Sequence, residues 1–178
     1  NSYSYGAGLR VGYLGEWLRY FSFGTSYQTK IWMSGFDDYA SLFAEQGDFD
    51  IPANWVAGIA IKPTENVDIA VDVQQVLYSG VASVANPLLP NLMQSPLGTD
   101  AGAGFGWEDM TTIKGGIQLR AGESWTWRAG YSYGSQPVPD SEVLFNILAP
   151  GVVEQHLTFG FSKMINNTQE ISFAVMRA

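Results

Sequence analysis

The sequence contains no cysteine, one histidine and no run of 18 or more apolar residues. The lack of cysteine excludes a disulfide framework and a thiolate metal site. The lack of a long apolar run excludes a transmembrane helix. Charged residues make up 15% of the chain, well below the roughly 25% usual for soluble domains. Lys and Arg number 9 against 17 Asp and Glu, which argues against nucleic acid as a partner, because phosphate binding requires basic clusters.

Alternation of apolar and polar residues runs through almost the whole chain and predicts β-strands. We expect about eight strands, at residues 3–13, 18–31, 53–62, 66–78, 108–120, 124–134, 153–164 and 169–177. Short turns are expected at 14–17, 63–65, 121–123 and 165–168, and long loops at 32–52, 79–107 and 135–152. Short turns at one end and long loops at the other are typical of outer-membrane barrels. No charged-then-apolar leader opens the sequence, so we expect any export signal to be removed or to lie outside this chain.

The two faces of the predicted strands differ sharply. One parity is apolar and aromatic, as in Trp125, Trp127, Tyr131 and Tyr133. The other parity carries polar residues among many glycines. In a soluble lipocalin-like barrel the apolar face would point inward, whereas in a membrane barrel it would face lipid. Glycine on the polar face and Trp and Tyr near the strand ends favour the membrane barrel. We therefore predict an all-β fold, an antiparallel transmembrane β-barrel or most of one, with residues 1–178 as one domain.

One strand departs from simple alternation. Gln74 and Gln75 interrupt the pattern before Val76. This predicts a β-bulge, with the end of the lipid-facing span as the alternative.

The polar parity supplies the candidate lumen residues, which are Arg10, Lys114, Arg128 and His156. The charges on this face include both signs, so we expect cross-strand ion-pair networks. A sharper alternative assigns Arg128 or Lys114 to the carboxylate of a fatty acid. His156 lacks metal partners at a usable spacing, so we expect no metal and no cofactor.

Two motifs resemble catalytic or phosphate-binding signatures. Residues 130–134 read GYSYG, which fits the G-x-S-x-G pattern of serine hydrolases, but they lie inside an alternating strand with no helix behind them. The glycine run at 102–106 lacks a surrounding βαβ unit and fits the return of a loop into a strand. We expect no catalysis.

The long loops are unusually apolar for segments outside a membrane. Large exposed apolar patches mark interaction sites, so the loops predict a groove that captures hydrophobic molecules. The alternative is a lid that buries these residues on one another. The candidate ligand-binding residues are Phe36, Tyr39, Leu42, Phe43, Leu88, Leu89, Leu92, Met93, Phe145 and Leu148.

Several stretches resemble the FadL/TodX family of outer-membrane transporters of long-chain fatty acids and other hydrophobic compounds. They are IPA followed by WVAGIAIKPTENVDIAVDVQ, then GFGWEDMTTIKGGIQLR, SWTWRAGYSYGSQPVP and FNILAPGVVEQHLTFGFS. The resemblance implies a fourteen-stranded barrel plugged by an N-terminal hatch. It also implies a ligand groove between extracellular loops, a lumen pocket and a lateral exit beside a kinked strand.

The sequence departs from this family in three respects. It shows no hatch segment and no early strands, and it ends at MRA in place of a terminal aromatic residue. We therefore expect a C-terminal portion of such a barrel or a shortened version of it. About eight strands are also enough for a small closed barrel with a filled interior.

These features predict passive uptake of a hydrophobic small molecule (fatty acid, alkane or aromatic) across the outer membrane of a Gram-negative bacterium. The expected surroundings are outer-membrane lipid and lipopolysaccharide, and the expected state is a monomer. Two alternatives are a structural or adhesive barrel with a filled lumen and a soluble lipid carrier.

Overall fold

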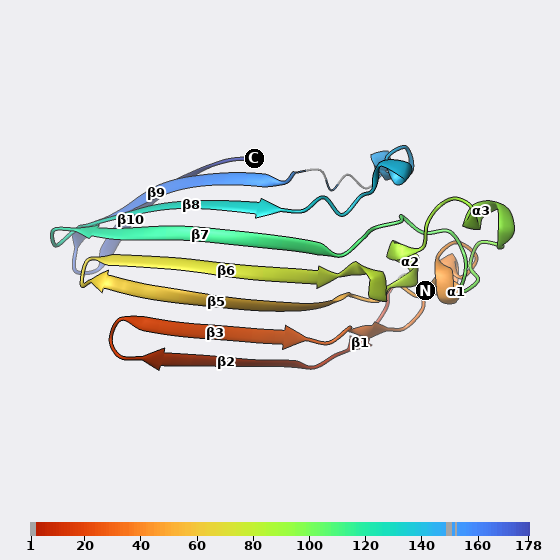
Figure 1. The fold of residues 1–178 in the computed structure, drawn as a ribbon, viewed down its shortest axis with the longest axis horizontal. Coiled ribbons are helices and arrows are strands. Elements are labelled where there is room, and N and C mark those ends of the chain that lie inside the picture. Colours follow the sequence, from red (N-terminus) through yellow and green to blue (C-terminus); the bar gives the residue numbers. More distant parts are fainter. Residues whose placement is uncertain (1–2, 149–150, 152) are drawn as a thin grey trace.

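The computed structural model describes residues 3–148, 151 and 153–178, and its main feature is an antiparallel sheet of eight strands (Figure 1). Along the sheet the order is β10-β9-β8-β7-β6-β5-β3-β2. The strands are β2 (Arg10–Trp17), β3 (Phe21–Gln28), β5 (Ala53–Thr64), β6 (Val67–Leu77), β7 (Met110–Ala121), β8 (Trp125–Gly134), β9 (Gln155–Asn166) and β10 (Gln169–Arg177). This confirms the all-β antiparallel prediction. β2 and β10 form the two edges, so the sheet is open and is not the small closed barrel considered above.

The N-terminal hairpin differs from its prediction. Residues 14–17 were expected to form a turn, but Leu14 pairs with Gly24 and Trp17 pairs with Phe21 inside the β2–β3 ladder. The chain reverses at Leu18 instead, whose φ of 52° is in the left-handed region. The preceding residues form only β1 (Gly6–Ala7), which pairs with β4 (Trp32–Met33) in a separate two-stranded ribbon.

The bulge predicted at Gln74 and Gln75 is wrong. Both residues keep register with β5 and with β7. Gln75 stays on the apolar parity because its amide oxygen accepts a hydrogen bond from the Trp55 indole at 3.0 Å. The irregularity in this hairpin lies elsewhere, between Ile61 and Thr64 of β5.

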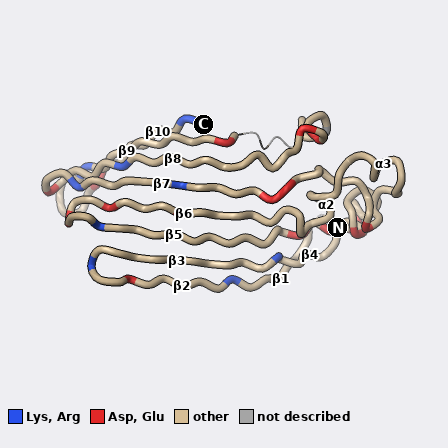
Figure 2. Tube along the Cα trace, in the orientation of Figure 1, with Lys and Arg blue, Asp and Glu red and all other residues tan. Residues whose placement is uncertain are grey.

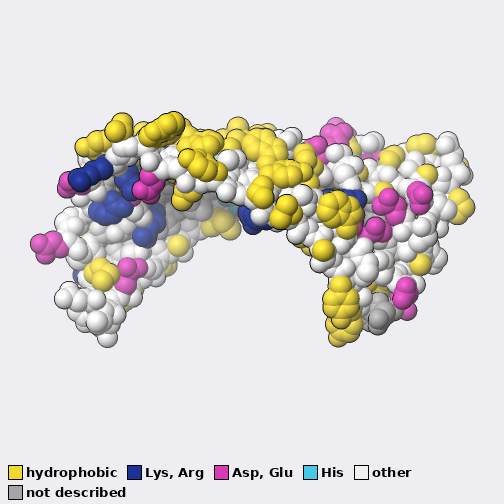
Figure 3. All heavy atoms as spheres, turned by 90° about the horizontal axis from the view of Figure 1, so that it is seen from below, with side chains coloured by type: hydrophobic (Ala, Val, Ile, Leu, Met, Phe, Trp, Pro, Cys, Tyr) yellow, Lys and Arg dark blue, Asp and Glu magenta, His cyan; other side chains and the backbone are white. Residues whose placement is uncertain are grey.

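The sheet is arched, and its two faces have opposite character. Hydrophobic side chains cover most of the convex surface, and charged side chains gather in the hollow (Figure 3). Most Lys and Arg residues of the strands lie toward the end with the short turns (Figure 2). The apolar residues of the alternating strands therefore lie on the convex side of the sheet. This is the arrangement predicted for a membrane barrel, and a lipocalin has the reverse.

The long connections gather at one end of the sheet (Figure 1). They contain the short helices η1 (Asp37–Tyr39), α1 (Ala44–Gly47), η2 (Tyr78–Gly80), α2 (Ala82–Ala85), α3 (Asn91–Gln94), η3 (Asp140–Glu142) and η4 (Phe145–Leu148). None of the helices in the described part of the chain is long and apolar enough to cross a membrane. Short turns lie at the opposite end, as predicted.

Candidate functional site

Aromatic rings of the first long loop form a continuous row. The ring centroids of Phe36 and Tyr39 are 6.2 Å apart, those of Tyr39 and Phe43 5.8 Å, and those of Phe43 and Phe49 5.2 Å. Aromatic pairs at these separations stabilise one another beyond the burial of their area. The row therefore holds Phe43 in place within the first long loop.

Two apolar cavities lie between the first and second long loops, and we call them the outer and the inner cavity. The outer cavity has a volume of about 460 Å³, and the inner cavity about 380 Å³. The outer cavity is lined chiefly by Leu42, Phe43, Leu88, Leu92, Leu97 and Phe105. The inner cavity is lined chiefly by Phe43, Phe49, Tyr78, Val84, Phe105 and Trp107. Because Phe43 and Phe105 belong to both walls, the cavities adjoin.

The structure places the predicted ligand-binding residues unequally. Leu42, Phe43, Leu88 and Leu92 line the outer cavity. Phe36 and Tyr39 lie in the aromatic row beside it. Leu89 and Met93 are not among the lining residues, and their side chains are 57% and 83% exposed. The side chains of Phe145 and Leu148 lie outside the described residues.

Phe105 and Trp107 line the inner cavity from the end of the second loop and were not predicted from the sequence. Both follow the glycine run that was interpreted only as the return into a strand. The available signal was the alternation of two aromatic residues with Gly104 and Gly106 directly before a predicted strand. Trp107 also packs edge-to-face on Tyr78, with centroids 5.0 Å apart.

The third long loop holds these aromatic residues from behind. The buried Asn146 side chain accepts a hydrogen bond from the Trp107 indole at 2.5 Å and donates to the Phe105 carbonyl at 2.8 Å. The buried Glu142 carboxylate accepts the Leu88 amide at 3.1 Å. Gly106, with a φ of 68°, leaves room for Glu142, because a Cβ there would lie 2.4 Å from the Glu142 Cγ.

We expect Asn146→Ala to loosen the wall of the inner cavity. The change removes the acceptor of the Trp107 indole N–H and one donor to the Phe105 carbonyl, which costs about 2 kcal/mol. The measurement is the fluorescence anisotropy and red shift of Trp107 in a variant whose other tryptophans are replaced by phenylalanine. An unchanged Trp107 spectrum would contradict this role for Asn146.

A partly buried acidic pair lies at the base of the first long loop. Asp50, 3% exposed, forms an ion pair with Lys30 and accepts the Met33 amide at 2.7 Å. Asp48 shares a hydrogen bond with Asp50, and its Oδ1 is buried with no partner among the described residues.

The two carboxyl groups have opposite pKa shifts. Burial raises the pKa of Asp50, but the hydrogen bonds from Lys30 and Met33 outweigh burial and hold that pKa below its usual range. Burial first, and then the charge of Asp50, raise the pKa of Asp48. The hydrogen bond with Asp50 raises the pKa of Lys30.

Across the concave face, polar side chains form a ladder over β6, β7 and β8. Asp68 forms an ion pair with Arg120 and accepts a hydrogen bond from the Gln118 amide at 2.9 Å. The Gln118 oxygen accepts from Arg128 Nε at 2.8 Å. These contacts carry the predicted network from one strand to the next.

The ladder continues over β9 and β10. Arg128 Nη1 donates to the Ser162 hydroxyl at 2.8 Å, and the Ser162 and Ser172 hydroxyls are 2.8 Å apart. Ser172 then donates to Glu170 at 2.7 Å. The polar ladder therefore joins five strands near the short turns, and only its Asp68–Arg120 step is an ion pair.

The other predicted lumen residues lie nearer the loop end. Lys114 donates to the Gln74 oxygen at 2.9 Å. His156 Nδ1 lies 3.5 Å from the Ser132 hydroxyl. Arg10 pairs with Gln28 at the edge of the sheet. No group of three or more His, Asp or Glu side chains placed to share a metal ion occurs among the residues that the structure describes.

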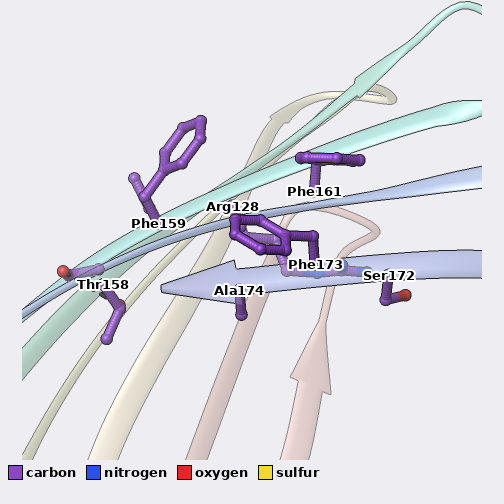
Figure 4. A pocket seen from close by; sticks show the side chains of 10 residues that line it. Arg128, Thr158, Phe159, Phe161, Ser172, Phe173 and Ala174 are labelled. Atoms are coloured by element: carbon purple, nitrogen blue, oxygen red, sulfur yellow. Dashed lines mark hydrogen bonds between the residues drawn. The ribbon is translucent and has the colours of Figure 1, made fainter. Parts of the chain in front are cut away.

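A hollow of about 360 Å³ borders the ladder where Gly130 and Gly160 leave the sheet bare. Its lining includes Arg128 (Figure 4). In Figure 4 Thr158, Ser172 and Ala174 point to one side of the strands, and Phe159 and Phe161 to the other. Arg128 thus has a small open space beside it.

Comparison with known proteins gives matches in structure alone. No protein-family model matches the sequence, and no curated protein matches it. The CymD monoaromatic hydrocarbon channel matches with a TM-score of 0.62 and 19% identity, over 97% of this chain and 46% of that one.

Two mutant forms of the TodX monoaromatic hydrocarbon channel also match. The deltaS2S3 mutant has a TM-score of 0.64 and 20% identity, over 95% of this chain and 43% of that one. The deltaS2 mutant has a TM-score of 0.60 and 19% identity, over 96% of this chain and 43% of that one. The chain spans less than half the length of each channel. Its resemblance to the FadL/TodX family is thereby confirmed in the fold: the chain has the architecture of part of the β-barrel of these channels.

Proposed function

We propose that the chain contributes part of the wall and the ligand-capturing loops of an outer-membrane channel for hydrophobic small molecules. The observation that carries this proposal is the pair of adjoining apolar cavities at the loop end of a sheet that is apolar outside and polar inside. Each cavity falls in the usual size range of small-molecule sites, roughly 300–1,000 Å³. The similar channels are described as monoaromatic hydrocarbon channels, which supports the same class of ligand.

The cavities suggest a path for the ligand. A hydrophobic molecule leaves water for the outer cavity because burial of its apolar surface is favourable, by about 25 cal/mol per Å². It then passes Phe43 and Phe105 to reach the inner cavity. Uptake follows the concentration gradient and involves no reaction. The surroundings proposed are outer-membrane lipid and lipopolysaccharide in a Gram-negative bacterium, with the protein as a monomer.

A fatty acid is the second candidate ligand, and the hollow beside Arg128 favours it. Arg128 donates hydrogen bonds from Nε and Nη1 within the ladder. Its Nη2 donates no hydrogen bond to the residues that the structure describes. A carboxylate in the hollow would make a charge-assisted hydrogen bond with this group. Lys114, bound to Gln74, is the alternative cation for the same role.

The adjacent residues Leu92 and Met93 of α3 give a direct test of the cavity. Leu92→Trp is expected to fill the outer cavity and to weaken the binding of naphthalene at least tenfold. Binding is measured by the fluorescence of naphthalene. Met93→Trp adds the same indole to a side chain outside the cavity and is expected to change affinity less than twofold. Equal effects of the two variants would contradict the cavity as the binding site.

A further inference from the structure

The convex face carries an unexpected charge. Within the strands that the structure describes, only Lys163 and Arg177 place a charge on the apolar parity. Arg177 is the last residue of β10, at its loop end. Lys163 lies near the short turn that joins β9 to β10, where it pairs with Trp125 on one side and with Ile171 on the other.

Lys163 is held over an aromatic wall. Its ammonium lies 4.9 Å from the centroid of the Trp125 ring. The Trp125 and Trp127 rings are stacked, with centroids 5.5 Å apart and planes 6° from parallel, and Phe161 packs against both. A cation over an indole face is attracted by the ring. No carboxylate in the described part of the chain forms an ion pair with Lys163.

The indole N–H groups of this wall also have no partner among the described residues. By contrast, the Trp55 indole donates to Gln75 at 3.0 Å, and the Tyr131 hydroxyl donates to Gln155 at 3.1 Å. A polar group left unpaired in hydrocarbon costs several kcal/mol. Three unpaired donors together, on Lys163, Trp125 and Trp127, therefore mark a level where polar acceptors are present, which is the headgroup region.

We propose that Lys163, Trp125 and Trp127 form a binding site for the phosphate group of an anionic phospholipid in the leaflet next to the short turns. The inference rests on the membrane location proposed above. The ammonium and the indole N–H groups donate to the phosphate and ester oxygens. The acyl chain lies along Phe161 and Phe173, whose centroids are 5.8 Å apart. The lysine stem lies along the aromatic wall while its charge reaches the interface.

The test compares phosphatidylglycerol with phosphatidylcholine bound to the full chain, counted by native mass spectrometry after release from mixed micelles. One lysine near a charged lipid surface favours the anionic lipid about fivefold. Lys163→Gln is expected to abolish this preference, and Lys163→Arg to retain it. Trp125→Phe keeps the ring but removes the N–H, and it is expected to reduce retention of both lipids.

Lys62→Gln is the matched control, because it removes an exposed lysine from β5, away from the aromatic wall, and is expected to leave the preference unchanged. The site is disproved if Lys163→Gln keeps the preference for the anionic lipid, or if Lys62→Gln reduces that preference as much as Lys163→Gln does. Flotation of each variant with lipid vesicles separates this result from the proposed function. A chain that fails to float contradicts the membrane location, whereas a chain that floats without a preference contradicts only the lipid site.

Discussion

Phe159→Arg is expected to lower the free energy of unfolding in lipid vesicles by about 2–4 kcal/mol, the cost of arginine on the lipid face near the bilayer midplane. Phe159 is 48% exposed in the middle part of β9, where it pairs with Ala129 and Val175 on the convex side. An arginine there would project from the apolar, convex side of the sheet. Urea titration in vesicles, with the heat-dependent shift on gel electrophoresis as a second readout, measures the loss.

Thr158→Arg is the control for this prediction. It introduces the same side chain one residue earlier, on the concave side, into the hollow that Gly130 and Gly160 leave open. We expect this variant to lower the free energy of unfolding by less than about 1 kcal/mol, as for substitutions at exposed positions away from a packed core. If both variants lose the same stability, the assignment of the two faces fails.

Asp50→Asn and Asp48→Asn are expected to change stability in opposite directions. Removing the Asp50 charge leaves Lys30 without its partner, which costs about 3 kcal/mol, the lower end for a buried pair because Lys30 is partly exposed. Asp48→Asn removes a buried charge and donates its amide to Asp50, so we expect a gain of about 1 kcal/mol at neutral pH. Exchange protection of the Met33 amide, which donates to Asp50, reports both changes.

The pH dependence of the first loop follows from the same pair. The pKa of Asp50 is lower in the fold than the unfolded value of about 3.9, so its contribution is present above that value and is lost as pH falls through the folded pKa. The pKa of Asp48 is raised, so its effect on stability is opposite. Its contribution to the free energy of unfolding is present at low pH and is lost as pH rises through the folded pKa. Asp48→Asn should therefore remove the loss of stability that occurs as pH rises. The exposed Asp37→Asn in the same loop is the control and should leave the profile unchanged.

Alternation alone predicted the sheet, the two faces and the long loops, because period two directly reflects the geometry of a strand. It misplaced the first strand because Tyr3 and Tyr5 alternate as well as Val11 and Tyr13 do. Only the pairing of Gly6 with Met33 separates β1 from β2. Gln75 appeared to break the alternation, since its hydrogen bond with Trp55 depends on a neighbouring strand.

The candidate site was predictable in composition and not in detail. Apolar loops predicted a cavity, but Leu88 and Leu89 are adjacent in sequence and only one lines it. Which side of a short helix faces inward is set by contacts with other loops. The same holds for Asn146, a polar residue whose importance appears only when Trp107 and Phe105 are placed around it.

The polar ladder has an electrical consequence. Its charged members are two acids, Asp68 and Glu170, and two arginines, Arg120 and Arg128. Their formal charges cancel, so beyond a Debye length, about 8 Å at physiological ionic strength, the ladder exerts almost no potential. The ladder itself therefore neither concentrates nor repels small ions at that distance, and an uncharged molecule meets almost no potential from it.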